Sequence, residues 1–317
     1  EGIPPGGAGR PAVAPADGDL AALAAFRERG LANGLAVTGL TDAQAREHEP
    51  HVAARAALHV AETGVIDYRA VCAVLLRRLR ESGAPLLPGT EVIGGSDGAR
   101  EVAVQTTRGD VVADVVVACA GLHADRVARL LGHEPSVRIV PFRGEYRSLT
   151  ADAAHLVRGL VYPVPDPTLP FLGVHLTRGI DGDVHAGPNA VLALAREGYD
   201  WRTVSPADLT ETLGYAGFWR LARTHHRSGL SEVTRSLSSR RFTQSVRRLV
   251  PELGDDDLVP APAGVRAQAV RPDGTLVDDF LVERHGRVVH LLNAPSPAAT
   301  ASLEIARHLV EDLSLRG

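Results

Sequence analysis

One segment near the end of the chain, from Gly286 to Leu313, constrains the fold more than any other. Residues 288–292 form an apolar run of strand length, and the Asn, Ala, Pro and Ser residues at 293–297 cannot continue a strand. A helix is predicted to follow, with Ser296 as its cap and Pro297 at its first position. The expected apolar face of this helix comprises Leu303, Ala306, Leu309, Val310 and Leu313.

This predicted strand, turn and helix could bind an electron-rich group. Small residues in the turn let another molecule approach the backbone, and the start of a helix offers unpaired N–H groups and a partial positive charge. A flavin ring or a phosphate fits such a site. An ordinary strand–helix connection in an α/β core is the alternative, and this segment alone does not decide between them.

The composition favours a globular protein that acts on small molecules. At 317 residues and 44% hydrophobic content, the chain can form one large or two medium domains. A net charge of -4 gives no general attraction to nucleic acid. Cys72 lies in a helical pattern and Cys119 in an apolar strand, so both thiols are expected to be buried and reduced, as in the cytoplasm. No apolar run reaches the roughly 18 residues of a membrane span.

Hydrophobic periodicity predicts a mixed α/β chain of two domains. Helices are predicted at 21–33, 41–49, 68–81 and 124–131 and in a block at 206–251, with Val71, Leu75, Leu76 and Leu79 on the buried side of the third. Strands are predicted at 57–60, 84–92, 101–107, 111–118, 142–149, 159–163, 171–177, 184–187, 265–269 and 276–283, and residues 10–14 are either a loop or an edge strand. This order suggests a parallel sheet interrupted by an antiparallel sheet.

Two predicted strands end in small residues, at 117–121 and at 292–299. Ligands bind at the carboxyl ends of strands in open α/β sheets, so both ends point to a nucleotide cofactor. The glycine-rich phosphate loop GxGxxG is nevertheless absent from the sequence. Gly6, Gly7 and Gly9 lie in PPGGAGRP, with no predicted strand before them.

Several longer segments resemble a known family. FRGEY, PFLGVHLTR and NAPSPAAT are specific to it, and CAGLHADRVA, GPNAVLALAREGY and GVRAQAV agree with them. The chain is therefore similar, over nearly its whole length, to L-2-hydroxyglutarate oxidases or dehydrogenases within the FAD-dependent D-amino-acid-oxidase-like superfamily. One departure is Ala118, where that family commonly has Asn.

The resemblance implies an FAD-binding three-layer β-β-α Rossmann-like domain and an antiparallel-sheet substrate domain. The substrate domain is expected at 1–56 and 138–283, and the FAD-binding domain at 57–137 and 284–317. Because the chain starts at Glu1 and contains no methionine, we expect an N-terminally truncated protein with an incomplete FAD-binding domain. The lost part would be at least one βαβ unit, about 30 residues, and would carry the glycine loop, so the fragment itself is expected to be inactive.

Oxidation of a 2-hydroxy acid moves the Cα hydrogen as hydride to the flavin while a base accepts the hydroxyl proton. His175 is the candidate base, because it alternates with the apolar residues Val174 and Leu176 and histidine titrates in the useful range. A solvent-facing or structurally bonded histidine is the alternative, and the base could equally lie outside this chain.

A dicarboxylate substrate needs more than one positive charge in a dry pocket. Arg143, Arg178 and Arg266 lie on or at the ends of predicted strands, and each could hold a carboxylate through two hydrogen bonds. Each arginine could instead form a structural ion pair, and Arg266 could touch the flavin. Three further residues could complete the hydrogen bonds to the substrate: Tyr146, Tyr162 and Asn189.

The expected cofactor is FAD, and neither a His–Glu spacing nor a CxxC motif indicates a metal. The expected FAD-contacting residues are Val92, Ala120, Gly121, Arg266, Asn293, Ala294, Pro295, Ser296, Pro297, Ala298 and Ala299.

The resemblance thus implies FAD-dependent oxidation of L-2-hydroxyglutarate to 2-oxoglutarate, with oxygen or a quinone as electron acceptor. Peripheral contact with the inner membrane is left open. Two alternatives remain: an FAD-dependent oxidoreductase for another amino acid, hydroxy acid or glycerol phosphate, and a non-catalytic dicarboxylate-binding module.

Overall fold

The computed structural model of the protein describes residues 6–7, 10–165, 173–295 and 298–314. The chain forms two compact units. The first contains Glu1–Val74, Arg143–Ala193 and His225–Val265, and the second contains Leu75–Phe142, Leu194–Thr224 and Arg266–Gly317. These divisions differ from the expected domain boundaries mainly at residues 57–74, 194–224 and 266–283. Residues 57–74 belong to the first unit because strand β4 (Ala56–Val60) pairs with two strands of that unit.

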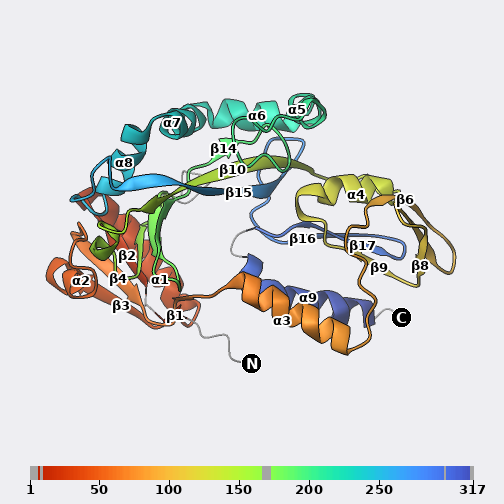
Figure 1. Cartoon of the computed structure of the whole chain (residues 1–317), viewed down its shortest axis with the longest axis horizontal. Helices are drawn as coiled ribbons and strands as arrows, with labels where there is room; N and C mark the ends of the chain where they lie inside the picture. The colour runs from red at the N-terminus through yellow and green to blue at the C-terminus, as the bar shows by residue number, and fades with distance from the viewer. Residues whose placement is uncertain (1–5, 8–9, 166–172, 296–297, 315–317) are drawn as a thin grey trace. The chain divides into compact units, whose positions relative to one another are not determined.

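A large sheet forms the centre of the first unit (Figure 1). Strands β10, β13, β12 and β11 pair antiparallel in this order, as the sequence predicts, and β11 then pairs in parallel with β2. β2 lies between β11 and β4, so it is an inner strand and the prediction of a loop or edge strand at 10–14 is wrong. The order along the sheet is β14 (Val191–Leu192), β10 (Arg138–Leu149), β13 (Val184–Gly187), β12 (His175–Arg178), β11 (Leu160–Pro163), β2 (Arg10–Ala14), β4 and β3 (Val37–Thr41), and β15 (Leu258–Val270) pairs with β10.

The two faces of this sheet pack differently, because side chains alternate along each strand. One face carries the largest core of the unit, in which Val161, Leu176 and Ala186 pack with Phe242 and Val246 of helix α8 (Ser239–Arg247). A smaller core lies on β2 and β4, where Ala12, Ala14 and Leu58 pack with Leu23 of helix α1 (Leu20–Ala32).

Local signals set the helices of the first unit. Helix α2 (Asp42–His48) begins after Thr41, whose hydroxyl accepts a hydrogen bond from the backbone N–H of Gln44. The Gln44 side chain in turn accepts from the Thr41 N–H, which completes a capping box. The predicted block at 206–251 forms α5 (Pro206–Leu213), α6 (Ala216–Thr224), α7 (His226–Leu237) and α8, the last two in the first unit.

The second unit contains two three-stranded sheets. In one, β9 (Val116–Ala118) pairs in parallel with β17 (Val288–Asn293), and β16 (Leu281–His285) pairs antiparallel with β17. The other comprises β6 (Val92–Asp97), β7 (Val102–Thr106) and β8 (Val111–Ala113). Helices α4 (Ala124–Leu130) and α9 (Ala298–Ser314) follow β9 and β17.

Two predicted strands of this unit differ from the structure. The strand predicted at 84–92 is not formed, and β6 begins at Val92 and runs through the predicted glycine turn. The run at 111–118 is divided between β8 and β9, which belong to different sheets. Val112 and Val117 are 56% and 41% exposed, so a strand buried on both faces was the wrong expectation. An apolar run indicates that a segment can form a strand. Whether that strand is buried depends on which elements from elsewhere in the chain pack against it.

The expected buried faces of two helices are also wrong. Helix α3 (Tyr68–Glu81) has no buried side chain, and Leu75, Leu76 and Leu79 are exposed. In α9, Leu309 is buried while Leu303 and Val310 are exposed. Cys72 and Cys119 are free thiols, but both are exposed rather than buried. In each case the apolar residues are present, but most of them keep substantial contact with solvent.

Strand β17 contains a buried histidine, His290, whose ring nitrogens make no hydrogen bond to the described residues. His290 is 1% exposed, and neither ring nitrogen has a hydrogen-bond partner in the described part of the chain. Its ring stacks on that of His133, with 5.2 Å between centroids, and His133 contacts Glu283 at 2.5 Å. Burial, with a smaller contribution from His133, lowers the pKa of His290 to about 4. The imidazole is therefore neutral at neutral pH.

We predict that this histidine makes the protein less stable in mild acid. The unfolded chain binds a proton at His290 below its ordinary pKa of 6.5, whereas the folded chain does not until about 4, so folding free energy is lost as pH falls between these values. The midpoint of urea unfolding should fall from pH 6.5 to 4.5, and His290→Leu should remove part of this fall. Equal pH dependence in both proteins would contradict the prediction. His308→Leu, at an exposed position of α9, is the control.

Candidate functional site

The two predicted cofactor-binding corners lie at one edge of a sheet. In the parallel ladder, Val289 is opposite Val117 and His290 is opposite Ala118. Parallel neighbours end at the same edge, so the residues after β9 and after β17 are adjacent. That both corners contact a cofactor stays a prediction. Gly121 turns the chain at the end of β9 with a φ of +53°, and a side chain there would meet open space.

Asn293 shapes the corner after β17. Its side-chain amide donates to the carbonyls of Val277 (3.0 Å) and Asp279 (2.9 Å), and its oxygen accepts from the N–H of Ala269 (3.4 Å). One buried side chain thus joins three backbone segments. The contact of Asn293 with a cofactor stays a prediction, and its side-chain amide already serves these backbone groups.

The other predicted cofactor residues are placed as follows. Ala294 and Ala299 are exposed, Ala120, Pro295, Ala298 and Arg266 are half-buried, and Ser296 and Pro297 lie outside the described residues. Val92 packs beside Val116 and Val288, at the amino ends of the two parallel strands rather than at their carboxyl edge.

In the first unit, the candidate base lies in a row of residues across the sheet. His175 is opposite Gly187 on β13, and Gly187 in turn adjoins Tyr146 on β10. On its other side the His175 ring stacks on Tyr162 of β11, with 4.1 Å between centroids and 15° between planes. The row therefore contains three of the predicted site residues, and Tyr146 packs closely on Gly187, where an added Cβ would lie 3.1 Å from its ring.

The orientation of His175 suits a proton acceptor. Val174 and Leu176 are buried in the main core, so the intervening side chain points to the other face, as the sequence predicts. Nδ1 lies 3.1 Å from the carbonyl oxygen of Gly173. A carbonyl only accepts, so Nδ1 carries the hydrogen and the lone pair of the neutral ring is on Nε2. Nε2 is the atom that can take a proton.

Arg143 and Asn189 meet in a buried cluster. Arg143 is fully buried, and its guanidinium donates to Oε1 of Glu145 at 2.8 and 3.1 Å. Oε2 of Glu145 accepts from Nδ2 of Asn189 (2.8 Å) and from the hydroxyl of Ser236. Burial pushes the pKa of Glu145 up, but these hydrogen bonds outweigh it and hold the pKa below its ordinary value. The carboxylate therefore stays charged beside Arg143.

Arg178 supports the backbone. It donates four hydrogen bonds to carbonyl oxygens: two to Val157 and one each to Ala154 and Gly182. One side chain thereby connects two segments of the first unit, the turn at 154–157 and the loop that contains Gly182. This differs from the expected clamp in which Arg178 binds a substrate carboxylate, because most of its donors already serve these carbonyls.

The predicted substrate residues thus divide between the two faces of the sheet. Leu176 and Arg178 share one face by alternation, and His175 lies on the other. Arg147 lies opposite Ala186 of the main core and stacks over Phe242, which puts Arg143 and Glu145 on that same core face. The structure brings His175, Tyr146 and Tyr162 together and keeps Arg143 and Arg178 away from them.

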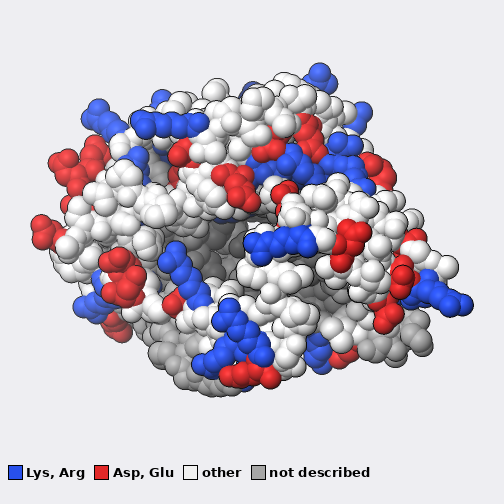
Figure 2. Space-filling view, turned by 45° about the vertical axis from the view of Figure 1, so that its right-hand side comes forward, with Lys and Arg blue, Asp and Glu red and all other residues white. Residues whose placement is uncertain are grey.

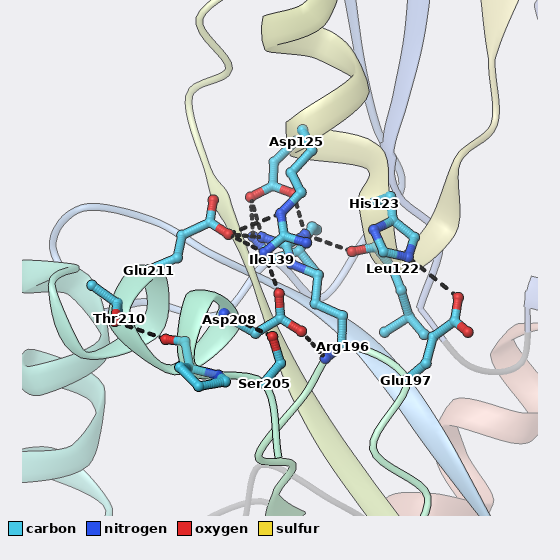
Figure 3. A network of polar contacts seen from close by, with 12 residues as sticks. Leu122, His123, Asp125, Ile139, Arg196, Glu197, Ser205, Asp208, Thr210 and Glu211 are labelled. Atoms are coloured by element: carbon cyan, nitrogen blue, oxygen red, sulfur yellow. Dashed lines mark hydrogen bonds and ion pairs between the residues drawn. The ribbon is translucent and has the colours of Figure 1, made fainter. Parts of the chain in front are cut away.

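A second charged network, in the other unit, was not found from the sequence (Figure 3). Asp125, in the first turn of α4, is fully buried and contacts the guanidinium of Arg196, which is 3% exposed. Arg196 also donates to the carbonyl of Leu122 (2.5 Å), directly after the turn at Gly121, and to Glu211 of α5 (3.1 Å). Arg126, Arg129 and Asp208 extend the network.

This network fixes the helix that follows the β9 corner. Burial raises the pKa of Asp125, but the hydrogen bonds and charge of Arg196 outweigh it, so the pKa lies below its ordinary value. Oδ2 of Asp125 also accepts a hydrogen bond from the backbone N–H of Ile139 (3.1 Å). Asp125 lies in the segment CAGLHADRVA and Arg196 in GPNAVLALAREGY. In the sequence, the only indication of a buried pair is that each charged residue stands among small and apolar ones.

Comparison with known proteins agrees with this geometry. Residues 2–312 match the family described as FAD dependent oxidoreductase. The chain belongs to this family. The cofactor of the family is FAD, and the two-domain α/β class expected from the sequence is confirmed.

Curated relatives align over nearly the whole chain. A protein of Escherichia coli strain K12 named L-2-hydroxyglutarate dehydrogenase is 43% identical over 95% of this chain and 72% of its own length. The protein of that name from Indibacter alkaliphilus is 40% identical over 98% of this chain and 78% of its own length. The human mitochondrial L-2-hydroxyglutarate dehydrogenase is 36% identical, over 97% and 70%.

Solved structures show the same fold at lower identity. An L-alpha-glycerophosphate oxidase from Mycoplasma pneumoniae, with FAD bound, has a TM-score of 0.76 at 20% identity over 98% of this chain and 73% of its own. A glycine oxidase from Geobacillus kaustophilus has a TM-score of 0.62 at 19% identity over 92% and 67%.

The corner between β9 and β17 fits part of a flavin cofactor. Cys119, Ala120 and Gly121 are small, Cys119 and Gly121 are exposed, and the space beside Gly121 is open. Partial burial raises the pKa of Cys119, so its thiol is neutral at neutral pH and adds no negative charge there. These residues can contact a flat group through backbone and small side chains.

Charge on the surface is mixed. Figure 2 shows basic and acidic side chains interspersed over the face in view, in keeping with a net charge of -4. Within the described ranges, no helix is both long enough and apolar enough to cross a membrane.

We predict that the Asp125–Arg196 pair is essential to the second unit. Asp125→Ala leaves the buried guanidinium of Arg196 without its main partner, which should cost about 3–5 kcal/mol of unfolding free energy. Urea unfolding followed by tryptophan fluorescence can measure this loss. Glu304→Ala removes a pair whose partners are 66% and 71% exposed and should change stability by less than about 1 kcal/mol. Equal effects of the two substitutions would refute the assigned role.

Proposed function

We propose that this chain forms the greater part of an enzyme that oxidises L-2-hydroxyglutarate to 2-oxoglutarate. The observation that carries the proposal is the 43% identity, over 95% of the chain, to the E. coli protein of that name. The row of His175, Tyr146 and Tyr162 provides residues that suit the reaction. The chemistry supplied by FAD, when bound, is acceptance of the Cα hydrogen as hydride.

His175 is the proposed base. As the Cα hydrogen leaves as hydride, Nε2 takes the hydroxyl proton and the Cα–O bond becomes a carbonyl. The hydrogen bond from Nδ1 to Gly173 stabilises the ring when it is protonated, because the imidazolium donates more strongly than the neutral ring. The stack on Tyr162 keeps the ring in one plane.

Tyr146 and Tyr162 are the proposed hydrogen-bond donors to the substrate, and Arg266 is the proposed cation beside the flavin edge. Arg266 belongs to the same compact unit as the β9–β17 corner and is three residues before Ala269, which Asn293 holds. Arg143, Asn189 and Arg178 are proposed to position the sheet, since each is bonded within the protein.

The electron acceptor is proposed to be oxygen or a quinone. A quinone is dissolved in the bilayer, so an enzyme that reduces it has to contact a membrane surface. We therefore include peripheral membrane contact in the proposal.

Two alternative functions can be distinguished from the proposed one by the substrate that the protein oxidises. Another FAD-dependent enzyme of the family would act on glycerol phosphate or on an amino acid, and a non-catalytic module would bind a dicarboxylate without oxidising it. The solved neighbours at 20% identity or less show the fold and do not favour either rival.

The test uses flavin reduction, which requires no knowledge of the acceptor. The sequence lacks a GxGxxG loop, so the chain alone is expected to purify without flavin colour. A fusion that adds the E. coli relative's uncovered residues should bind FAD, and anaerobic L-2-hydroxyglutarate should then bleach it. Bleaching by glycerol 3-phosphate or glycine but not by L-2-hydroxyglutarate would overturn the proposal, as would FAD loading without bleaching by any of the three.

We predict that His175→Gln in this fusion lowers the rate of flavin reduction by about 10²–10⁴-fold with little change in substrate affinity, because general-base catalysis contributes about that much. Stopped-flow absorbance measures both quantities. His48→Gln, at an exposed position of α2, is the control and should leave the rate unchanged. A His175→Gln rate within a few-fold of the parent would assign the proton transfer to another group.

A further inference from the structure

The side of helix α7 that faces the first unit carries polar residues. Ser236 donates to Glu145 inside the first unit, and Glu232, four residues earlier on the same side, accepts from the backbone N–H of Ala190 (3.1 Å). Glu232 is also paired with Arg235 at 2.6 Å. Surface helices usually bury their apolar side and expose the polar one, so α7 is reversed.

The outward face of α7 carries two protruding leucines. Leu230 and Leu237 are 67% and 71% exposed. They are seven residues apart, which places them on one side of the helix, two turns from each other. Arg227 is exposed beside them.

Helix α8, which packs against α7, has a basic outer face. Phe242 and Val246 bury its apolar side in the main core. The exposed side carries Arg240, Arg241, Arg247 and, directly after the helix, Arg248. Residues 226–248 contain six arginines and one glutamate, in a chain whose net charge is -4.

We propose that α7 and α8 form a docking surface for an anionic lipid membrane. Leu230 and Leu237 enter the interface between headgroups and acyl chains, and Arg227, Arg240, Arg241, Arg247 and Arg248 contact the phosphates. Protruding apolar residues beside cations are the pattern of peripheral membrane helices. A lipid surface yields around a leucine, whereas a protein partner would need a matching pocket.

A second copy of the chain fits this surface less well. In a two-fold symmetric contact the same patch meets itself, so the arginines of both copies would face one another and repel. The loop after α8 carries four acids, Glu252, Asp255, Asp256 and Asp257, which leaves residues 226–257 with six arginines against five acids. The inference deepens the proposed membrane contact and is independent of which substrate is oxidised.

The test is sedimentation of the whole chain with vesicles, without substrate. Vesicles containing phosphatidylglycerol should pellet the protein and pure phosphatidylcholine vesicles should not. Binding should weaken as ionic strength rises from 0.1 to 1 M, because the Debye length falls from about 10 to about 3 Å.

Substitutions locate the surface. Arg240→Gln with Arg248→Gln should weaken binding about fivefold per arginine, and Leu230→Ser with Leu237→Ser should weaken it at least about tenfold. Leu31→Ser and Arg27→Gln, at exposed positions of α1, are matched controls and should bind as the parent does. Circular dichroism of each variant checks that it is folded.

Three results would overturn the inference: no pelleting with anionic vesicles, equal pelleting with neutral ones, or parent-like binding by both folded double variants. A parent that is dimeric by light scattering, made monomeric by Leu230→Ser with Leu237→Ser, would assign the face to a second copy instead.

Discussion

The alternation of side chains along β12 is the constraint on which the candidate site depends. Val174 and Leu176 are held in the main core of the first unit, which fixes His175 on the opposite face. A register slip of one residue would place an apolar side chain at the reacting position and bury the imidazole. The antiparallel pairing of β12 with β11 and β13 prevents this slip, and it also brings Tyr162 and Gly187 to the two sides of the ring.

Buried charged residues have a different structural role in each unit. Around Glu145 it joins the sheet to α7 through Ser236, so the helix is attached by a polar contact and its leucines are left outside. Around Asp125 it fixes the start of α4 behind the β9 corner. In neither place does the charged cluster contain the candidate base. Buried ion pairs in such positions specify an arrangement more than they add stability.

The sequence was most informative where a signal is local. The helix predicted at 41–49 and the alternation around His175 follow from short-range patterns, and the structure has both. The two small-residue corners were located from the sequence, and the parallel pairing of β9 with β17 places them at one edge. The family resemblance, carried by whole segments such as FRGEY and NAPSPAAT, is confirmed by residues 2–312 matching one family.

What the sequence could not predict depends on residues far apart in the chain. Arg143 and Glu145 are two residues apart, but the other partners of Glu145 are 44 and 91 residues away, so nothing local marks this pair as part of a buried cluster. Leu75, Leu230 and Leu303 have the same hydrophobicity as buried leucines, and only the absence of a covering element distinguishes them. Arg178 resembled a ligand-binding arginine because the loops that it holds are assembled only by the fold.

Gly187 has a consequence for how this site could change. Its φ of +140° is strained for any other residue, and an added Cβ would lie 2.9 Å from the carbonyl oxygen of Glu145. Any other residue at this position would therefore displace Tyr146 and the backbone of β10 beside it. Replacement of Gly187 would thus disturb the proposed base indirectly, through Tyr146, although position 187 carries no side chain of its own.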